Sequence, residues 1–532
     1  MNSKTKNHFK KPIKISGQKS FKSVSRSNPG SILDTAENQT KDSAKSLQVR
    51  LKHEFIDCSD FILREVAIDS QLNIQASVFI AFIDGYVDKV ILNQDVIQPI
   101  LSRLSGKNLQ GISLLGTLKK TIIENCMLEE INDFKQIVAA VLSGNAIIFV
   151  DGEGCALKAG VRSSVGRKVE EPNTETTLRG SREGFVENLQ TNMILLRKRL
   201  KTSNLKFEPM TLGLQTKTEI RICYLKGVAN ESIIEEVKSR LKKIDTDQIL
   251  DSGDLEHFIQ DSSIPLFPLV GNSEKPEKVA AKLLEGRVAI ICDGTPVVLT
   301  VPYLLVESLQ TADDYYATPV YASMMRLLRL TAILISTLLP GFYVALISFH
   351  QAVIPFKLIM TMAASREGIP FSAFFEALIL GATFEFLREA GIRLPKPIGP
   401  TIGIVGAIVL GEAAVRAGIA SAPLVIITSI TAICGLIVAP LIQALTVIRL
   451  IIIAAANFMG LLGIAEIGTA ILIYLASLRT FGVPYLTPFS PLHIKDLHDS
   501  ILLAPAWAMV LRPKMFTSEK KSGSKDGTRQ AS

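Results

Sequence analysis

The chain has 532 residues, of which 48% are hydrophobic and 20% are charged. This is too long for one ordinary domain and too apolar for a disordered protein, so we expect two or three structural units. The net charge of +8 gathers at the two ends, because residues 1–52 carry +9 and residues 512–532 carry +4, which leaves −5 between them. A globally basic nucleic-acid-binding protein is therefore disfavoured, and we expect no nucleic acid among the partners.

Residues 1–52 form a basic arm rich in Ser and Asn. The arm lacks the apolar core of about 7–15 residues that marks a secretory signal, so we expect the N-terminal half to stay in the cytoplasm. A solvated, disordered tail is the first interpretation of such a composition. Contact of the basic side chains with anionic lipid on the cytoplasmic face is the alternative.

Residues 53–165 and 201–310 are expected to form two duplicated α/β subdomains. Segments that end in a glycine match in two pairs, Gly85 with Gly227 and Gly152 with Gly294, and both pairs are offset by 142 residues. A constant offset indicates an internal duplication. The runs AIIFV and VAIIC suit strands covered on both faces, and helical patterns lie at 87–104, 128–142, 231–244 and 275–285.

Residues 166–200 are expected to be a polar linker followed by a connecting helix, VENLQTNMILLRKRL. The polar part, 170–184, is either an exposed linker or a contact surface for a partner or for the membrane domain. The candidate contact residues are Arg179, Arg182, Glu183 and Asn188.

Residues 322–492 are expected to form an all-α polytopic membrane domain. Charged residues are absent from 330–356 and 417–448, and Glu466 is the only one in 450–478. A membrane-spanning helix needs about 20 apolar residues, so these are three spans. The shorter stretch 397–418 is a fourth, and 370–390, with its four charged residues, is an interfacial or re-entrant helix or part of a further span.

Basic residues flank this domain on both sides, with Arg326 and Arg329 before it and a basic tail over 493–532 after it. The positive-inside rule therefore places both ends in the cytoplasm and makes the number of spans even. The rule is not obeyed everywhere, because Arg388, Arg393 and Lys396 lie in a loop that four spans would place outside.

The stretch 397–418 carries small residues at helical spacing. The stripe consists of Gly399, Gly403, Ala407, Gly411, Ala414 and Gly418. It is either a static helix-packing surface or the lining of a pore built from several copies of this helix. Glu412 and Glu466 are candidate intramembrane acidic residues, which either form a cation-favouring ring in an oligomer or pair with a basic residue such as Arg416 or Arg449.

Motifs that would indicate chemistry are missing from the sequence. The chain has no P-loop, GxGxxG, HExxH or GxSxG, and its six cysteines form no CxxC pair. Scattered cysteines argue against a disulfide scaffold or a Cys-rich zinc site and suit a reducing compartment. We therefore expect no enzyme, no catalytic residues, no metal site and no cofactor.

Several long stretches carry a family likeness. They are IDGYVDK (83–89), EEPNTETTLRGSREGFVENLQTNMILLRKRL (170–200), ILDSGDLEHFI (249–259), LLEGRVAIICDGTPVVLTVP (283–302), LPGFYVALISFH (339–350), FEFLREAGIRLPKPIGPTIGIVGAIVLGEAAVRAG (384–418) and SLRTFGVPYLTPFSPL (477–492). With these, the chain resembles the A subunits of the GerA family of nutrient germinant receptors of bacterial spores. The resemblance covers roughly residues 53–511.

The resemblance implies a function that composition does not give. Such A subunits work with a multi-span B subunit, thought to hold the nutrient, and a lipid-anchored C subunit in the inner spore membrane. The complex senses small nutrients and starts germination, and the A subunit is thought to self-associate into a nutrient-gated cation channel. A non-conducting scaffold or sensor whose α/β half binds a ligand or partner is the alternative, and a solute transporter is a weaker third.

Overall fold

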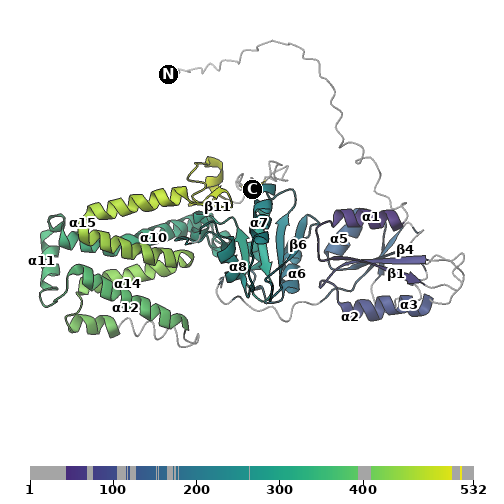
Figure 1. The fold of residues 1–532 in the computed structure, drawn as a ribbon, viewed down its shortest axis with the longest axis horizontal. Coiled ribbons are helices and arrows are strands. Elements are labelled where there is room, and N and C mark those ends of the chain that lie inside the picture. Colours follow the sequence, from purple (N-terminus) through teal and green to yellow (C-terminus); the bar gives the residue numbers. More distant parts are fainter. Residues whose placement is uncertain are drawn as a thin grey trace, which may run out of the picture.

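Three bodies follow one another along the computed structural model of the chain. The structure describes residues 44–68, 76–104, 128–150, 155–163, 179–262, 264–393, 409–505 and 516–517, with a few single residues between these ranges. A first α/β unit lies at one end, a second α/β unit lies in the middle, and a helical bundle lies at the other end (Figure 1).

The first unit is a five-stranded antiparallel sheet with helices on both faces. Its strands are β1 (Phe61–Ile68), β2 (Ala76–Ile83), β3 (Leu128–Ile131), β4 (Ala146–Val150) and β5 (Ala156–Ala159), in the order β1-β2-β4-β5-β3. Helices α1 (Ala44–Glu54) and α5 (Phe134–Leu142) cover one face, and α2 (Lys89–Ile91), a π-helical turn (Leu92–Ile97) and α3 (Gln98–Leu104) cover the other (Figure 1).

Alternation along the central strands supplies a core on each face. Ile80 and Ile148 pack toward α3, whereas Phe79 and Phe149 pack toward α1 and α5, with ring centroids 5.3 Å apart. The helix predicted over 128–142 is wrong in its first part, because residues 128–131 pair with β5 as an edge strand.

The second unit repeats this plan. Its strands are β6 (Leu205–Leu212), β7 (Thr218–Leu225), β8 (Gly271–Ser273), β9 (Val288–Cys292) and β10 (Val298–Val301), in the order β6-β7-β9-β10-β8. Its helices are α7 (Glu231–Lys242), α8 (Ser252–Ile259) and α9 (Pro276–Leu284). Strands β2 and β7 begin at 76 and 218, β4 and β9 at 146 and 288, and β5 and β10 at 156 and 298, so each difference is 142, the offset found in the sequence.

Helix α6 (Leu189–Arg199) joins the two units and packs between them. Ile194 belongs to the core of the first unit, while Leu195 and Leu196 belong to that of the second. Arg197, which is fully buried, donates two hydrogen bonds to Asp60 at 2.8 and 3.0 Å. A planar guanidinium on a carboxylate is a directional contact, so this pair fixes the first unit against the helix.

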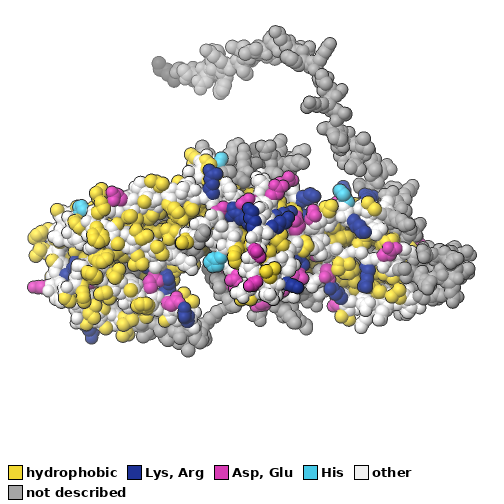
Figure 2. All heavy atoms as spheres, viewed as in Figure 1, with side chains coloured by type: hydrophobic (Ala, Val, Ile, Leu, Met, Phe, Trp, Pro, Cys, Tyr) yellow, Lys and Arg dark blue, Asp and Glu magenta, His cyan; other side chains and the backbone are white. Residues whose placement is uncertain are grey.

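The bundle consists of α10 (Pro319–Ser348), α11 (Phe356–Ala364), α12 (Ala373–Arg393), α14 (Ala422–Ile437) and α15 (Ile442–Ser477). Within the described residues, two helical segments are long and apolar enough to cross a membrane, Pro319–Ser348 and Ala439–Ser477, and α14 is apolar but shorter. Hydrophobic side chains cover most of the visible face of the bundle, whereas charged side chains gather on the α/β units (Figure 2).

Helix α15 is not one straight rod. Gly460 has φ 61° and ψ −137°, a conformation that only glycine adopts readily. A Cβ on Gly463 would lie 2.5 Å from the carbonyl oxygen of Ala455. In a continuous helix, which rises about 1.5 Å per residue, these two residues would lie far apart. The chain therefore turns back at Gly460, and residues 442–459 and 461–477 form a helical hairpin.

The predicted limits of the spans need correction. The sequence pattern predicts a boundary between two spans at Arg449. In the structure, the boundary between α14 and α15 lies at 438–441, around Pro440, and the chain reverses direction again at Gly460. Arg449 lies inside the helix because an acidic partner compensates its charge. The run expected to begin at residue 330 belongs to a helix that begins at Pro319 and ends at Ser348.

The bundle starts and ends on the second α/β unit. Beyond α15 the chain forms the short hairpin β11 (Arg479–Thr480) and β12 (Val483–Pro484), and Thr480 donates a hydrogen bond to the carbonyl oxygen of Leu269 at 2.8 Å. Phe481 and, near the C-terminus, Phe516 both enter the core that α7 and α8 share with the sheet. The chain thus returns to the unit from which α10 departs.

Candidate functional site

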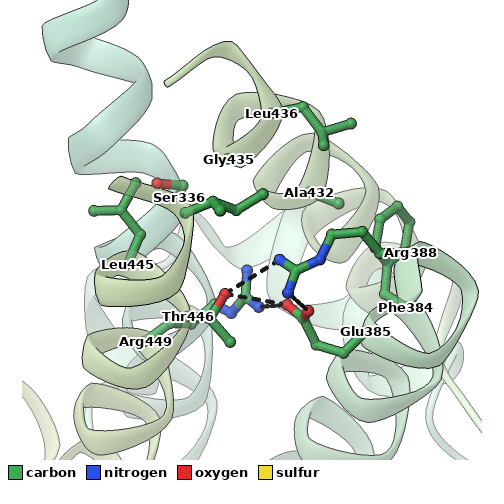
Figure 3. Close-up of a pocket in the computed structure, with 11 residues that line it drawn as sticks. Ser336, Phe384, Glu385, Arg388, Ala432, Gly435, Leu436, Leu445, Thr446 and Arg449 are labelled. Atoms are coloured by element: carbon green, nitrogen blue, oxygen red, sulfur yellow. Dashed lines mark hydrogen bonds and ion pairs between the residues drawn. The ribbon is translucent and has the colours of Figure 1, made fainter. Parts of the chain in front are cut away.

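Charged side chains meet inside the bundle between α12 and α15. The Glu385 carboxylate lies 2.6 Å from Arg449 Nη2 and 2.5 Å from Arg388 Nη2 (Figure 3). Thr446 donates to the same carboxylate at 3.3 Å and accepts from Arg388 at 3.4 Å. These side chains lie on helices whose surroundings are otherwise apolar, which strengthens each ionic contact.

This cluster ties helices together. Two guanidiniums on one carboxylate leave a net charge of about +1 there, since arginine stays protonated. The adjoining cavity has a volume of only about 20 Å³, which holds about one water molecule. A small cavity with net positive charge does not suit cation passage, so we assign the cluster to packing of α12 against α15.

A second acidic residue of α12 holds the start of α14. Glu376 is buried and accepts hydrogen bonds from the backbone N–H and the hydroxyl of Ser421 at 2.9 and 2.6 Å. Ser421 directly precedes α14, so the carboxylate lies at the positive end of that helix. Arg366 lies 3.4 Å from the other carboxylate oxygen. Helix α12 therefore contacts the other helices of the bundle through paired charges, and its orientation in a membrane stays a prediction.

A buried ionic network joins the bundle to the chain before and after it. Arg326 of α10 is fully buried and contacts Asp314 at 3.2 Å and Asp499 at 2.9 Å. Arg329, one turn further along α10, lies 2.7 Å from Asp314. Asp314 precedes α10 and Asp499 follows α15, so one arginine connects the entry and the exit of the bundle. We call Asp314, Arg326, Arg329 and Asp499 the junction network.

The carboxylate of Asp314 is held in its ionised form. Burial raises the pKa of this group, but hydrogen bonds from Arg329, from the Thr311 backbone and from Arg326 outweigh burial and place the pKa below its usual value. The pKa of Glu307 is also below its usual value, because Arg287 and Lys282 lower it by more than burial raises it. Both acids are therefore ionised at neutral pH.

The small-residue stripe lies partly outside the described residues. Gly399, Gly403 and Ala407 fall in 394–408, which the structure does not describe, so their role stays a prediction. Gly411 faces Val425 of α14, and Gly418, with φ 66°, ends the described helical turn beside the carbonyl oxygen of Gly368. Ala414 is partly exposed.

The two predicted intramembrane acids differ in their surroundings. Glu412 pairs with Arg416 at 2.6 Å on the exposed side of its helix, which was one of the two interpretations. Glu466 is exposed on the second half of the α15 hairpin and has no hydrogen bond or ion pair within the part of the chain that the structure describes. Arg449 forms its ion pair with Glu385 and not with Glu466.

The four residues proposed for interdomain contact lie before and at the start of α6. Asn188 caps this helix through the Thr191 N–H at 2.9 Å, and Glu183 pairs with Lys198 at 2.5 Å and with Arg199 at 2.8 Å. Arg179 and Arg182 are exposed. Sequence reasoning missed Arg197, which makes the buried contact.

Sequence reasoning also missed the ion pairs formed by acids of the bundle and of the chain on either side of it. Asp314 and Glu376 are buried, and Glu307, Glu385 and Asp499 are partly buried. One signal was available, since a charged residue inside an apolar helical pattern must find a partner when the helix is buried. The identity of that partner depends on contacts between residues that are far apart in the sequence.

Comparison with known proteins gives a consistent result. The model of the Bacillus/Clostridium GerA spore germination protein family matches residues 49–515. Spore germination protein KA of Bacillus subtilis (strain 168) is 39% identical over 472 residues, which are 88% of this chain and 86% of that protein. Spore germination protein GerLA of Bacillus cereus is 35% identical over 472 residues, covering 88% of this chain and 94% of that protein.

A solved structure also matches. It is the crystal structure of the N-terminal domain of the A subunit of the Bacillus megaterium spore germinant receptor GerK3. The match has a TM-score of 0.39 and 28% sequence identity, and it covers 50% of this chain and 97% of that one.

Proposed function

The chain belongs to the GerA family of spore germination proteins and is a germination receptor subunit, and we propose that it oligomerises into a nutrient-gated cation channel of the inner spore membrane. In this proposal the B subunit holds the nutrient, the lipoprotein C subunit completes the complex, and this chain conducts. Names of relatives such as spore germination protein KA and spore germination protein A1 support the germination role.

The main support for the proposed membrane topology is that the chain returns to the second α/β unit after the bundle. Because Arg326 at the start of α10 contacts Asp499 beyond α15, the bundle begins and ends on one side. A polytopic domain with this property crosses the membrane an even number of times. Together with the basic flanks of the sequence, this supports a cytoplasmic location for the α/β half and the C-terminal tail.

Glu466 supports self-association. A charged side chain at the centre of a bilayer costs at least about 2.5 kcal/mol, and such residues face other protein or water. Glu466 lies on an apolar hairpin, near exposed Leu462 and Ile473 and away from the ionic contacts of the bundle. In an oligomer, each copy of the chain would contribute its own Glu466, and a ring of carboxylates favours cations.

Gating would follow from a shift between two arrangements of the helices. A bound nutrient moves such an equilibrium only by its differential affinity for the two states. The 397–418 stripe would allow close helix approach in one state and separation in the other. The junction network connects the start of α10 with the chain beyond α15. A movement of the α/β half relative to the helices would therefore displace both ends of the bundle.

Potassium release from spores tests the channel role. A deletion strain is complemented with the wild-type chain, with Gly403→Val or with Glu466→Gln, and nutrient-triggered release is measured at equal protein abundance. We expect release to be lost or slowed in both variants. Gly391→Val is the control, because a Cβ at Gly391 meets nothing within 4 Å.

Normal release from both variants, with the partner subunits at normal levels, would contradict the channel assignment. A non-conducting scaffold or sensor would then be the better function, with the α/β half binding a ligand or partner and the bundle transmitting the signal.

A further inference from the structure

A large cleft separates the second α/β unit from the start of α15. Its volume is about 770 Å³, within the range of about 300–1,000 Å³ that is usual for small-molecule sites. The walls include Glu256 and His257 of α8, Glu277 and Lys282 of α9, Tyr316, and Gln443 near the start of α15. An occupant would thus touch both the α/β unit and the bundle.

The basic side chains of the cleft are already paired with acids of its own wall. Lys278 lies 2.5 Å from Glu175, and Lys282 lies 2.7 Å from Glu307. Arg287 contacts Glu307 and also lies 3.1 Å from Glu285. These cations have little capacity left for an anionic ligand, because their charge is compensated before any ligand arrives.

Two further carboxylates of the wall are less fully compensated than these, because Glu256 has no ion pair within the described residues and Glu277 has one long contact, with Arg199 at 3.8 Å. Glu256 accepts one hydrogen bond, from Gln260 at 3.3 Å, and no basic side chain within the described residues forms an ion pair with it. Burial raises the pKa of Glu256 by more than neighbouring His257 and this hydrogen bond lower it. Glu277 Oε2 accepts from the Tyr316 hydroxyl at 3.2 Å and lies 3.8 Å from Arg199 Nη1. Its other carboxylate oxygen, Oε1, is buried and has no hydrogen-bond partner within the described residues.

The other side chains of the cleft wall indicate which class of ligand would bind there. Within the described residues, no group of three or more His, Cys, Asp or Glu side chains is placed to hold a metal ion. The Tyr316 ring is partly exposed at the same wall, and aromatic rings beside carboxylates are typical of sites for organic ammonium groups. The Tyr316 ring beside Glu277 therefore favours an organic ammonium ligand.

We propose that this cleft binds a small organic cation, with Glu256 and Glu277 as its anionic partners. The site lies between the second α/β unit and the start of α15, so its ligand is a property separate from ion conduction and the proposal does not depend on the channel function. Because the ligand would bridge α8 and α9 to the start of α15, it would favour one placement of the α/β unit against the helices.

The test uses the purified full chain in lipid nanodiscs and three probes of similar size: benzylammonium, neutral benzyl alcohol and anionic benzoate. We expect saturable binding of benzylammonium by calorimetry or ligand-observed NMR, with weaker binding of the other two. The double variant Glu256→Gln with Glu277→Gln should weaken benzylammonium binding by at least about tenfold, as expected for loss of a hydrogen bond to a charged group.

Glu235→Gln is the control, since Glu235 is exposed on α7 and does not line the cleft. Absence of saturable benzylammonium binding, equal binding of benzyl alcohol or benzoate, or unchanged binding in the double variant would overturn the proposal. If the double variant fails to fold, Glu256→Gln alone decides the question. Potassium release is measured separately, so failure of this site and failure of the channel function remain distinguishable.

Discussion

At the scale of single residues, Asp314 is an acid of the short 3-10 helix Ala312–Tyr316 that stabilises the start of α10. Its carboxylate receives hydrogen bonds from Arg326 and from Arg329. Removing one member of a buried ion pair leaves the other charge uncompensated, which costs more than the intact pair contributes. The junction network should therefore be sensitive to neutral replacement of this acid.

We expect Asp314→Asn to lower the free energy of unfolding by about 3 kcal/mol, near the lower end for a broken buried pair, because Asp499 still contacts Arg326. Thermal unfolding of the purified chain in detergent measures this. Asp245→Asn makes the same chemical change at an exposed site and should have little effect. Equal unfolding midpoints for the two variants would show that the junction network does not stabilise the chain.

Acid should weaken the same region. Asp314 and Glu307 have pKa values below their usual range in the folded chain, so the unfolded chain binds protons more readily. Their stabilisation is complete above the unfolded pKa of about 4 and is lost as the pH falls through the lower folded value. We expect the unfolding midpoint to change little between about pH 7 and pH 5 and to fall below about pH 4, less steeply in Asp314→Asn.

At the scale of elements, the α15 hairpin depends on one glycine. A Cβ on Gly460 would lie 2.8 Å from the His350 ring and 3.1 Å from Phe349, and the positive φ disfavours any other residue. Gly460→Ala should therefore destabilise the bundle by about 1–3 kcal/mol through backbone strain alone. Gly468→Ala, where a Cβ meets nothing within 4 Å, should be neutral or slightly stabilising.

Abundance in the membrane and the unfolding midpoint both report on this pair of variants. If Gly460→Ala behaved like Gly468→Ala, the two halves of α15 would not need the reversal that the structure shows.

Elements with a strong local pattern could be predicted from the sequence. The strands AIIFV and VAIIC, the repeat offset of 142 and the connecting helix α6 all follow from short apolar or helical patterns. The helical hairpin could not be predicted, because Gly460 lies in an apolar run that reads as one span and its φ depends on the neighbouring end of α10. Arg449 was taken as a span boundary for the same reason, since its partner Glu385 lies far away in the sequence.

At the scale of the whole molecule, residues 516–517 of the C-terminal tail pack against the second α/β unit. Phe516 is buried in its core, the Phe516 carbonyl accepts from the Asn230 N–H at 3.0 Å, and Arg287 lies over the ring at 4.4 Å. Phe516→Ala should lower the free energy of unfolding by about 3 kcal/mol or more. Phe258→Ala removes a half-exposed ring and should cost less, so equal losses would contradict the docking of the tail.

The docked tail also makes a prediction about topology. Phe481 after α15 and Phe516 near the C-terminus share a core with α7, so we expect the α/β half and residue 516 to lie on the same side of any membrane that the bundle crosses. Fusions of a cytoplasm-active fluorescent protein and a periplasm-active phosphatase to each end should therefore give matching results in a bacterial host. We expect fluorescence and no phosphatase activity at both ends, because basic flanks favour the cytoplasmic side. Opposite signals at the two ends would mean an odd number of crossings, which the shared core of the second unit does not allow.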